Sequence, residues 1–201
     1  DTNPYVNATT TAPNTDFLGA AIAIDDAATL SLSNYQMQVR MECGDNEGPG
    51  LLVRVQDDNT FYRINFTAAA TGTGETRPPQ GMSIQKCDGR GGGNPVWTEL
   101  FRETSDPFIY TNHTADGETF PFDVKVSVTN NPGGTATTIR VEVIDDPEEL
   151  ATPHAWEVVD SVDPILTGTV GLTNWGAGNV DFGRSIGVRW SGYGGDVSAP
   201  L

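Results

Sequence analysis

The side chains of this sequence best suited to chemistry are carboxylates that gather in its turns. Asp45 and Glu47 lie in one glycine-rich turn, and Asp57 and Asp58 lie in the next turn along the chain. Calcium is bound by roughly six to eight oxygen atoms, mostly from carboxylates and loop carbonyls. These acidic residues are therefore the candidate ligands of a calcium ion, with a solvated acidic surface as the alternative.

Aromatic rings beside amide or hydroxyl groups are a second chemical signal, because a sugar has an apolar face and a rim of hydroxyls. Trp175 follows Asn174 in a turn, where an aromatic ring is not needed for strand packing. Tyr110 and Trp97 are further candidates. The sequence thus predicts a glycan-binding site at these residues, and rings that merely cap the core are the alternative.

The motifs that would support catalysis do not have the required spacing. Retaining hydrolysis of a glycoside needs two carboxyl groups about 5 Å apart, but Glu142 and Asp145 fall on opposite faces of an expected strand. His113 and His154 lie in expected loops. The Gly-x-Ser-x-Gly pattern at residues 183–187 lacks the strand, turn and helix of a nucleophile elbow. We therefore expect a protein that is not an enzyme.

Several features favour an oxidising, extracellular compartment. Asn-x-Ser/Thr triplets begin at Asn7, Asn65 and Asn112, and are candidate N-glycosylation sites. Cys43 and Cys87 each end an expected strand. A disulfide between them would stabilise the fold by about 4 kcal/mol, and two buried free thiols are the alternative. The chain begins without Met or a signal peptide, which is typical of a mature secreted protein or an excised domain. We expect an extracellular or cell-surface protein.

The charge balance argues against two classes of partner. Lys and Arg number 11 and Asp and Glu number 27, so the formal net charge is −16 at pH 7. A field of this sign repels nucleic acid and anionic membrane surfaces. The apolar runs are also too short for a transmembrane helix. We expect no binding to nucleic acid and no insertion into a membrane.

Alternation of apolar and polar residues dominates the chain and predicts half-buried antiparallel strands. They are expected at residues 35–43, 51–56, 60–67, 82–87, 96–102, 122–129, 138–144, 156–159, 168–173 and 180–190. Short strands separated by turns favour an all-β, two-sheet antiparallel β-sandwich, or jelly roll. Polar residues expected on an outer sheet face are Gln36, Gln38, Arg40, Arg54 and Arg63. Residues 1–16 are polar and without period, so we expect an N-terminal arm or linker followed by a sandwich domain at 17–201.

The order of the segments at 35–41, 50–64, 122–126 and 168–176 with 180–182 resembles that of the concanavalin A-like lectin/glucanase jelly rolls. It is most similar to the laminin G-like and thrombospondin C-terminal-type modules, in which a hairpin like the one at 50–64 comes early. The resemblance implies a fold whose members bind glycans or proteins, often with calcium, or act as glycanases or lyases.

Three functions remain open on these grounds. The first is a secreted, non-catalytic glycan- or matrix-binding adhesion module, with a polysaccharide or glycoprotein as partner and calcium as its cofactor. The second is a self-assembling structural glycoprotein of a surface layer or filament, whose partners are copies of itself. The third is a polysaccharide lyase or hydrolase, which needs a titratable pair in a groove that the sequence does not show.

Overall fold

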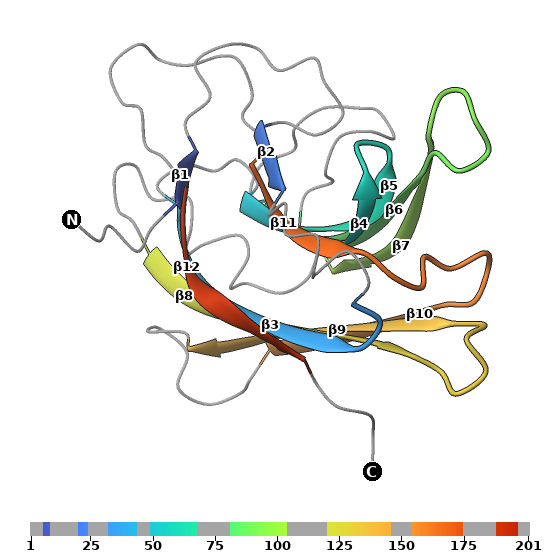
Figure 1. Cartoon of the computed structure of the whole chain (residues 1–201). Helices are drawn as coiled ribbons and strands as arrows, with labels where there is room; N and C mark the ends of the chain where they lie inside the picture. The colour runs from blue at the N-terminus through green and yellow to red at the C-terminus, as the bar shows by residue number, and fades with distance from the viewer. Residues whose placement is uncertain are drawn as a thin grey trace.

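The protein is a sandwich of two antiparallel sheets, as the alternation predicts. The computed structural model describes residues 6–8, 20–23, 32–43, 49–67, 81–103, 120–145, 154–174 and 188–196. The first sheet has the strand order β1-β12-β3-β8-β9-β10, and the second has the order β2-β11-β4-β5-β6-β7. Figure 1 shows them as two stacked layers. The described residues include no helix with the length and apolar character needed to cross a bilayer.

Nine of the strands agree closely with expected segments, and two more lie at the N-terminal end. The last strand shares only residues 188–190 with the segment expected at 180–190, whose other residues lie outside the described ones. The bounds of the strands are β1 Val6–Ala8, β2 Ala20–Ala23, β3 Tyr35–Cys43, β4 Pro49–Asp57, β5 Thr60–Thr67, β6 Gly81–Asp88, β7 Val96–Glu103, β8 Phe120–Asn130, β9 Thr137–Asp145, β10 His154–Asp160, β11 Thr169–Asn174 and β12 Val188–Asp196.

The segment expected to be an arm contributes a strand to the sandwich. Val6, Asn7 and Ala8 form β1 and pair with β12 at one edge of the first sheet. The expectation that residues 1–16 lie outside the sheets is therefore wrong for these residues. A strand this short carries too few side chains to show an alternating pattern, which is why no sequence signal marks it.

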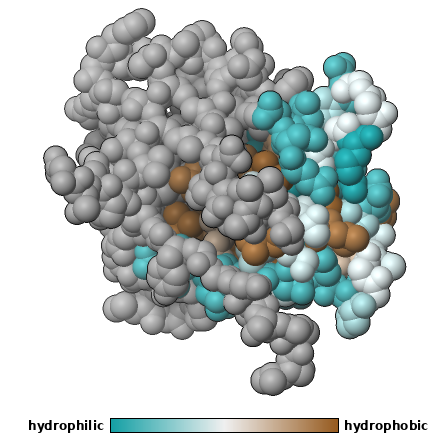
Figure 2. Space-filling model, viewed as in Figure 1, coloured by the Kyte–Doolittle hydropathy of each residue, from teal (hydrophilic) through white to brown (hydrophobic). Residues whose placement is uncertain are grey.

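The hydrophobic core lies between the sheets and is built from alternate residues of each strand. On β8, Val124, Val126 and Val128 are fully buried, and on β3 Tyr35 and Met37 join the same cluster. Figure 2 shows hydrophobic residues in a band between the sheets, with hydrophilic residues on either side of it. Each fully buried aliphatic side chain contributes about 1.5–3 kcal/mol, so this core accounts for much of the stability.

Arg54 does not lie on an outer sheet face, because the pairing of β4 with β5 is irregular between Val53 and Asp57. Its backbone has a φ of 58° and its side chain is fully buried. The guanidinium donates hydrogen bonds to the carbonyl oxygens of Leu32 and Ser33 and to Asn130 Oδ1. Arg54 therefore connects β4 to β8 and to the segment that leads into β3.

A buried ion pair joins the two sheets. Lys86 Nζ of β6 lies 2.8 Å from Asp160 Oδ2, at the end of β10. The Tyr62 hydroxyl of β5 donates to the same carboxylate oxygen at 2.8 Å and accepts a hydrogen bond from the backbone of Ile165. Lys86 also donates to the carbonyl oxygen of Val162 at 2.6 Å. These bonds hold the segment after β10 against the second sheet.

Candidate functional site

The outer face of the second sheet carries polar side chains where β5, β6 and β7 lie side by side. Tyr62, Ile64 and Phe66 of β5 point into the core, so Arg63 and Asn65 point outward. Two rows of paired residues cross the strands, one through Arg63, Gln85 and Glu99 and one through Asn65, Ser83 and Arg102. We call these six residues, together with Trp97, the polar face.

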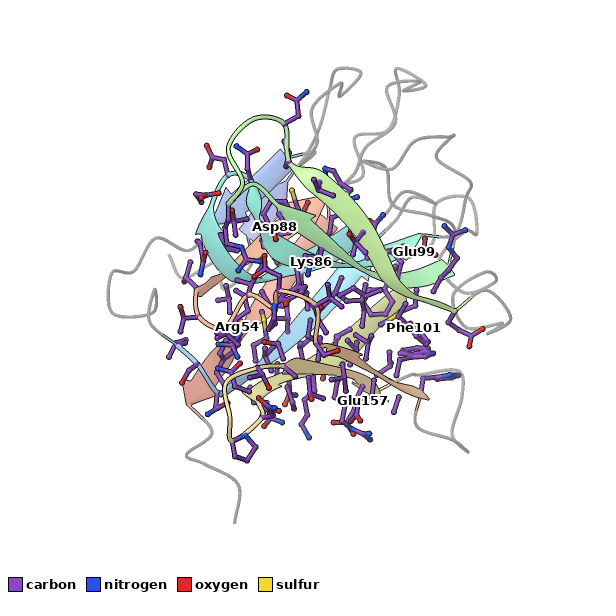
Figure 3. The ribbon with its side chains drawn as sticks, turned by 90° about the vertical axis from the view of Figure 1, so that its right-hand side faces the viewer. Arg54, Lys86, Asp88, Glu99, Phe101 and Glu157 are labelled. Carbon is purple, nitrogen blue, oxygen red and sulfur yellow. The ribbon has the colours of Figure 1, made fainter. Side chains whose placement is uncertain are left out.

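Among the described residues, those of the polar face on β5 and β6 are buried, and Glu99 and Arg102 on β7 are exposed. Arg63, Asn65 and Ser83 are at most 1% exposed. The side chains of Glu99 and Arg102 are 39% and 43% exposed and form an ion pair. Outer faces of sandwich sheets are ordinarily polar because water reaches them. Here polar groups are buried instead, and Figure 3 looks onto the β7 edge, where Glu99 lies.

Arg63 and Trp97 form the centre of this arrangement. The guanidinium carbon of Arg63 lies 4.3 Å from the centroid of the Trp97 ring, a cation–π contact. Arg63 Nε and Nη2 donate to Gln85 Oε1 at 3.2 and 2.7 Å. Burial lowers the pKa of Arg63 to about 9, and the neighbouring Cys87 opposes that shift. The guanidinium therefore remains charged at neutral pH, although it is buried.

A small apolar cluster borders the polar face and holds Trp97 in place. Phe61 meets the Trp97 ring edge-on, with the ring centroids 5.7 Å apart. The members of the cluster are Leu52, Val55, Phe61, Cys87 and Trp97. The indole is thus fixed by packing on one side and by Arg63 on the other.

Trp97 and Ser83 each carry a polar atom that is buried without a hydrogen-bond partner in the structure. These atoms are the indole nitrogen Nε1 and the hydroxyl oxygen Oγ. Buried polar groups are nearly always hydrogen-bonded, and an exception calls for an explanation such as a bound water or ligand. Exceptions on two neighbouring strands of one sheet face mark it as the candidate binding site in the described part of the chain.

Of the four predicted glycan-binding residues, the structure describes Trp97 and Asn174. Trp97 is only 8% exposed, so it is not an open aromatic platform. Asn174 is the last residue of β11. Trp175 and Tyr110 lie outside the described residues. The sequence pattern did contain a signal for the polar face, because alternate positions of the strands at 60–67 and 82–87 are polar, but such positions are ordinarily solvated.

Two of the four predicted calcium ligands, Asp45 and Glu47, lie outside the described residues. Asp57 is the last residue of β4, and Asp58 follows it in the turn to β5. Asp57 Oδ1 accepts a hydrogen bond from the backbone of Asn59 within its own turn. Among the described residues, no group of three or more His, Cys, Asp or Glu side chains could hold a metal.

The expected disulfide is not formed. Cys87 is a free, buried thiol, and its sulfur lies 3.3 Å from the carbonyl oxygen of Asn59. It belongs to the apolar cluster on the outer face of the second sheet, whereas Cys43 ends β3 of the first sheet. The alternative of a buried free thiol is therefore correct for Cys87. Burial raises its pKa to about 12.

Of the candidate glycosylation sites, Asn65 is the one whose burial the structure describes. Asn65 is fully buried in the middle of the second sheet, on the polar face. A glycosyltransferase cannot reach it in the folded chain, so the expectation of a glycan there is wrong for the native state. Asn7 lies on β1, and Asn112 falls outside the described residues.

The residues considered for catalysis have other partners. Glu142 forms ion pairs with Lys125 and Arg140. His154 begins β10 rather than lying in a loop and stacks on Trp156, with ring centroids 5.9 Å apart. His113 and the pattern at 183–187 lie outside the described residues.

Comparison with known proteins gives similarity of fold. No family model matches the chain, and no curated protein matches it. The tail fiber protein gp63.1 from an E. coli phage is similar at a TM-score of 0.45 and 15% identity, over 98% of this chain and 21% of that one. Peanut lectin with a 9mer peptide is similar at 0.44 and 13%, over 98% and 94%. Lectin UEA-II complexed with galactose is similar at 0.39 and 11%, over 94% and 91%.

The chain therefore spans about a fifth of the tail fiber protein and nearly the whole of each lectin chain. At these identities the similarity concerns the arrangement of strands and says nothing of a ligand.

Proposed function

We propose that this protein is a non-catalytic carbohydrate-binding domain, and that the polar face forms the floor of its binding site. The observation that carries the proposal is the pair of buried, unsatisfied atoms Trp97 Nε1 and Ser83 Oγ on one sheet face. Leaving such a group unpaired costs about 1–3 kcal/mol. A ligand that forms a hydrogen bond with each would recover that free energy.

The chemistry of the polar face suits a saccharide. An indole, an amide, a hydroxyl and a guanidinium together can bind the hydroxyl rim of a sugar in several directions at once. Gln85 and Ser83 lie next to the exposed pair of Glu99 and Arg102 on the neighbouring strand. A sugar would therefore approach from the β7 edge, and binding requires the side chains there to move so that the buried groups become accessible.

The same face supports binding rather than hydrolysis. Glycosidases ordinarily use two carboxyl groups that flank the scissile bond. Glu99 is the one carboxylate among the residues that define the polar face, and its Oε2 is held by Arg102. A single, neutralised carboxylate does not provide the separate acid and base that hydrolysis needs.

The proposal is tested first with a glycan array, run with calcium and repeated with a chelator. Binding that survives the chelator supports the polar face as the site, and binding that is lost adds calcium as a cofactor. Hits are then measured by calorimetry on Ser83→Ala and Trp97→Phe, each of which removes one unsatisfied group. We expect a three- to tenfold or greater loss of affinity for each, roughly what one hydrogen bond contributes.

A matched control variant is Arg140→Gln, which changes an exposed residue on the outer side of the other sheet. It should bind like the parent chain. If all three variants bound the glycan with the affinity of the parent chain, the binding site would lie elsewhere than on the polar face. If no glycan on the array bound, the proposal would be overturned, and light scattering would then test the alternative of self-assembly.

The cellular setting follows as part of this proposal. A polysaccharide or glycoprotein outside the cell is the partner we propose, with the protein at the cell surface or secreted. The formal charge of −16 supports a hydrophilic domain that does not bind nucleic acid.

A further inference from the structure

The two sheets end in four edge strands, counted over the described residues, and two of these strands are short. The strand orders place β1 and β10 at the ends of the first sheet, and β2 and β7 at the ends of the second. An edge strand leaves a row of backbone N–H and C=O groups unpaired, and proteins protect such edges with short strands, bulges or charged side chains. β1 has three residues and β2 has four, so each offers few groups to another chain.

β7 is protected by a bulge and by charge. Its pairing with β6 shifts between Ile84 and Gln85, which leaves Leu100 with no residue opposite it on β6. A bulge of this kind bends the strand and redirects its side chains. Glu99 and Arg102 thereby reach the same face and form an exposed ion pair, so β7 is a poor template for a further strand.

β10 is neither short nor irregular. It has seven residues, and all of them pair with β9 without a shift in register. Its sequence contains no Pro, Gly or Lys. Ala155, Glu157 and Val159 are exposed on the outer face of the sheet. A regular edge strand with exposed apolar side chains is a place where a further strand can add.

The large hydrophobic side chains that are exposed in the described part of the chain lie on or beside this edge. Val159 belongs to β10 and is 56% exposed, and Val162 lies two residues beyond the end of β10. Val96 begins β7, which contacts β10 between the two sheets. Exposed apolar surface of this kind marks a site of association, and here it coincides with an open backbone edge.

The unpaired groups of a strand edge select an extended strand as their partner, and a second copy of β10 matches them. Two antiparallel copies related by a twofold axis present the same groups to each other, so the donors of one strand meet the acceptors of the other. If Glu157 lies at the axis, all seven residues pair, and the small Ala155 of one copy lies opposite Val159 of the other. Arg140 of β9 lies 3.7 Å from Glu157, so each copy brings one positive and one negative charge to the centre of the pairing.

We infer that β10 is the docking edge for a second copy of this chain, and that two copies join their first sheets into one continuous sheet through antiparallel β10 strands centred on Glu157. The polar face lies on the other sheet, so this inference is independent of the proposed function. One pair of seven-residue strands is a small interface, for which a weak, concentration-dependent dimer is expected.

Sedimentation equilibrium of the intact chain, from about 10 µM to about 1 mM, measures the dimer. Each copy has a formal charge of −16, so two copies repel each other over long range. Salt screens that repulsion, and we therefore expect the dimer fraction to rise between about 50 mM and about 500 mM salt. A chain that stays monomeric at the highest concentration and salt would overturn the inference.

Hydrogen exchange shows where the two copies meet. The amides on the open edge of residues 154–160 become hydrogen-bonded in the dimer, so their exchange should slow as the dimer fraction rises. Exchange in β7, residues 96–103, should not change. Protection that appeared on β7, and not on β10, would contradict the assignment of the edge.

Val159→Glu should weaken the dimer, because it replaces an exposed apolar side chain with a negative charge in each copy. The dissociation constant should rise roughly tenfold. Thr129→Glu is the matched control: Thr129 of the inner strand β8 lies in the same row as Val159, with Thr138 of β9 between them. Equal weakening by both variants would indicate a general effect of charge and would overturn the inference.

Glu157→Gln should strengthen the dimer, a gain that a merely destabilised protein would not show. It removes two like charges that face each other at the axis, and the dissociation constant should fall roughly three- to tenfold. Glu99→Gln makes the same change in net charge on the β7 edge and is the control; Figure 3 labels both glutamates. Equal gains in the two variants, or no gain from Glu157→Gln, would contradict the pairing centred on Glu157.

Discussion

Gly168 and Arg54 touch backbone to backbone: a Cβ atom on Gly168 would lie 2.4 Å from the carbonyl carbon of Arg54. This close approach lets the segment before β11 lie against the irregular part of β4. The Gly168 amide also donates a hydrogen bond to the carbonyl oxygen of Leu32, in the segment before β3, at 3.3 Å. No flexible side chain is involved, so neither partner can rotate away from an added methyl group.

Gly168→Ala should therefore destabilise the fold by at least about 2 kcal/mol, through overpacking against rigid backbone. Urea denaturation would measure the change. Gly133→Ala is the control, because a Cβ there would come no closer than 3.8 Å to another residue, and its effect should stay within about 0.5 kcal/mol. If the two substitutions lowered the free energy of unfolding by similar amounts, the close contact at Gly168 would be contradicted.

Lys86→Met should destabilise the protein by about 3–5 kcal/mol, because it leaves the buried Asp160 carboxylate without its counterion. The double variant Lys86→Met with Asp160→Asn should cost less than the two single variants added together. A double-mutant cycle in urea measures this coupling. Lys125→Met breaks a partly exposed pair with Glu142 and should cost no more than about 1 kcal/mol. Strict additivity for Lys86 and Asp160 would mean that they do not interact.

Stability should fall as the pH rises from 10 towards 12. Burial raises the pKa of Tyr35 from 10.0 to about 12, with Arg54 partly opposing the shift. The unfolded chain then loses the phenolic proton at a lower pH than the folded chain, which favours unfolding in that window. Burial raises the pKa of Tyr62 as well. Tyr35→Phe should be less stable at pH 8 but lose less stability between pH 10 and 12; an unchanged slope would contradict the assignment.

The Cys87 thiol should be almost inert in the native protein. Burial raises its pKa to about 12, and only the thiolate reacts with disulfide reagents. In a Cys43→Ala variant, Ellman's reagent at pH 8 should label Cys87 slowly until urea unfolds the chain, and then fully. Rapid labelling of the folded variant, or a Cys43–Cys87 disulfide in the parent chain by non-reducing peptide mapping, would contradict the structure.

Asn65 should carry no glycan in folded protein, even when the chain passes through a glycosylating secretory pathway. Because the side chain is fully buried between neighbouring strands, chains modified there during synthesis cannot close the second sheet. Peptide mapping of the soluble fraction tests this. Thr67→Ala, which removes the acceptor triplet, should raise the soluble yield, while Thr67→Ser keeps the triplet and serves as control. A soluble, folded chain with a glycan on Asn65 would refute the prediction.

The sequence predicts the layered architecture well because strand alternation reports directly on burial. The valines at 124, 126 and 128 mark the core face of β8 without further information. The turn before β9 is equally clear, and its Gly134 amide donates to the carbonyl oxygen of Asn131 as a hairpin turn requires. Arg54 shows the limit of such reasoning. The alternation of side chains along a strand predicts that Arg54 lies on the outer face. The irregular pairing of β4 with β5 instead turns its side chain into the protein.

The candidate site was less accessible to sequence analysis because it depends on contacts between distant segments. Polar residues at alternate positions of β5 and β6 are what any solvated outer face would have. Only the fold shows that Ser83 and Arg63 are buried, and that Trp97 covers the guanidinium.

The strand order also bears on how the chain is synthesised. β12 lies between β1 and β3, and β11 lies between β2 and β4, so each sheet receives an inner strand from the last part of the chain. A ribosome that has translated only as far as Asp160, the end of β10, has produced β1 and β2 without their partners. Folding then depends on pairings between segments far apart in sequence, which form slowly. The nascent protein thus exposes unpaired strand edges until β11 and β12 have been made, and a lower growth temperature or a chaperone that covers such edges should raise its yield.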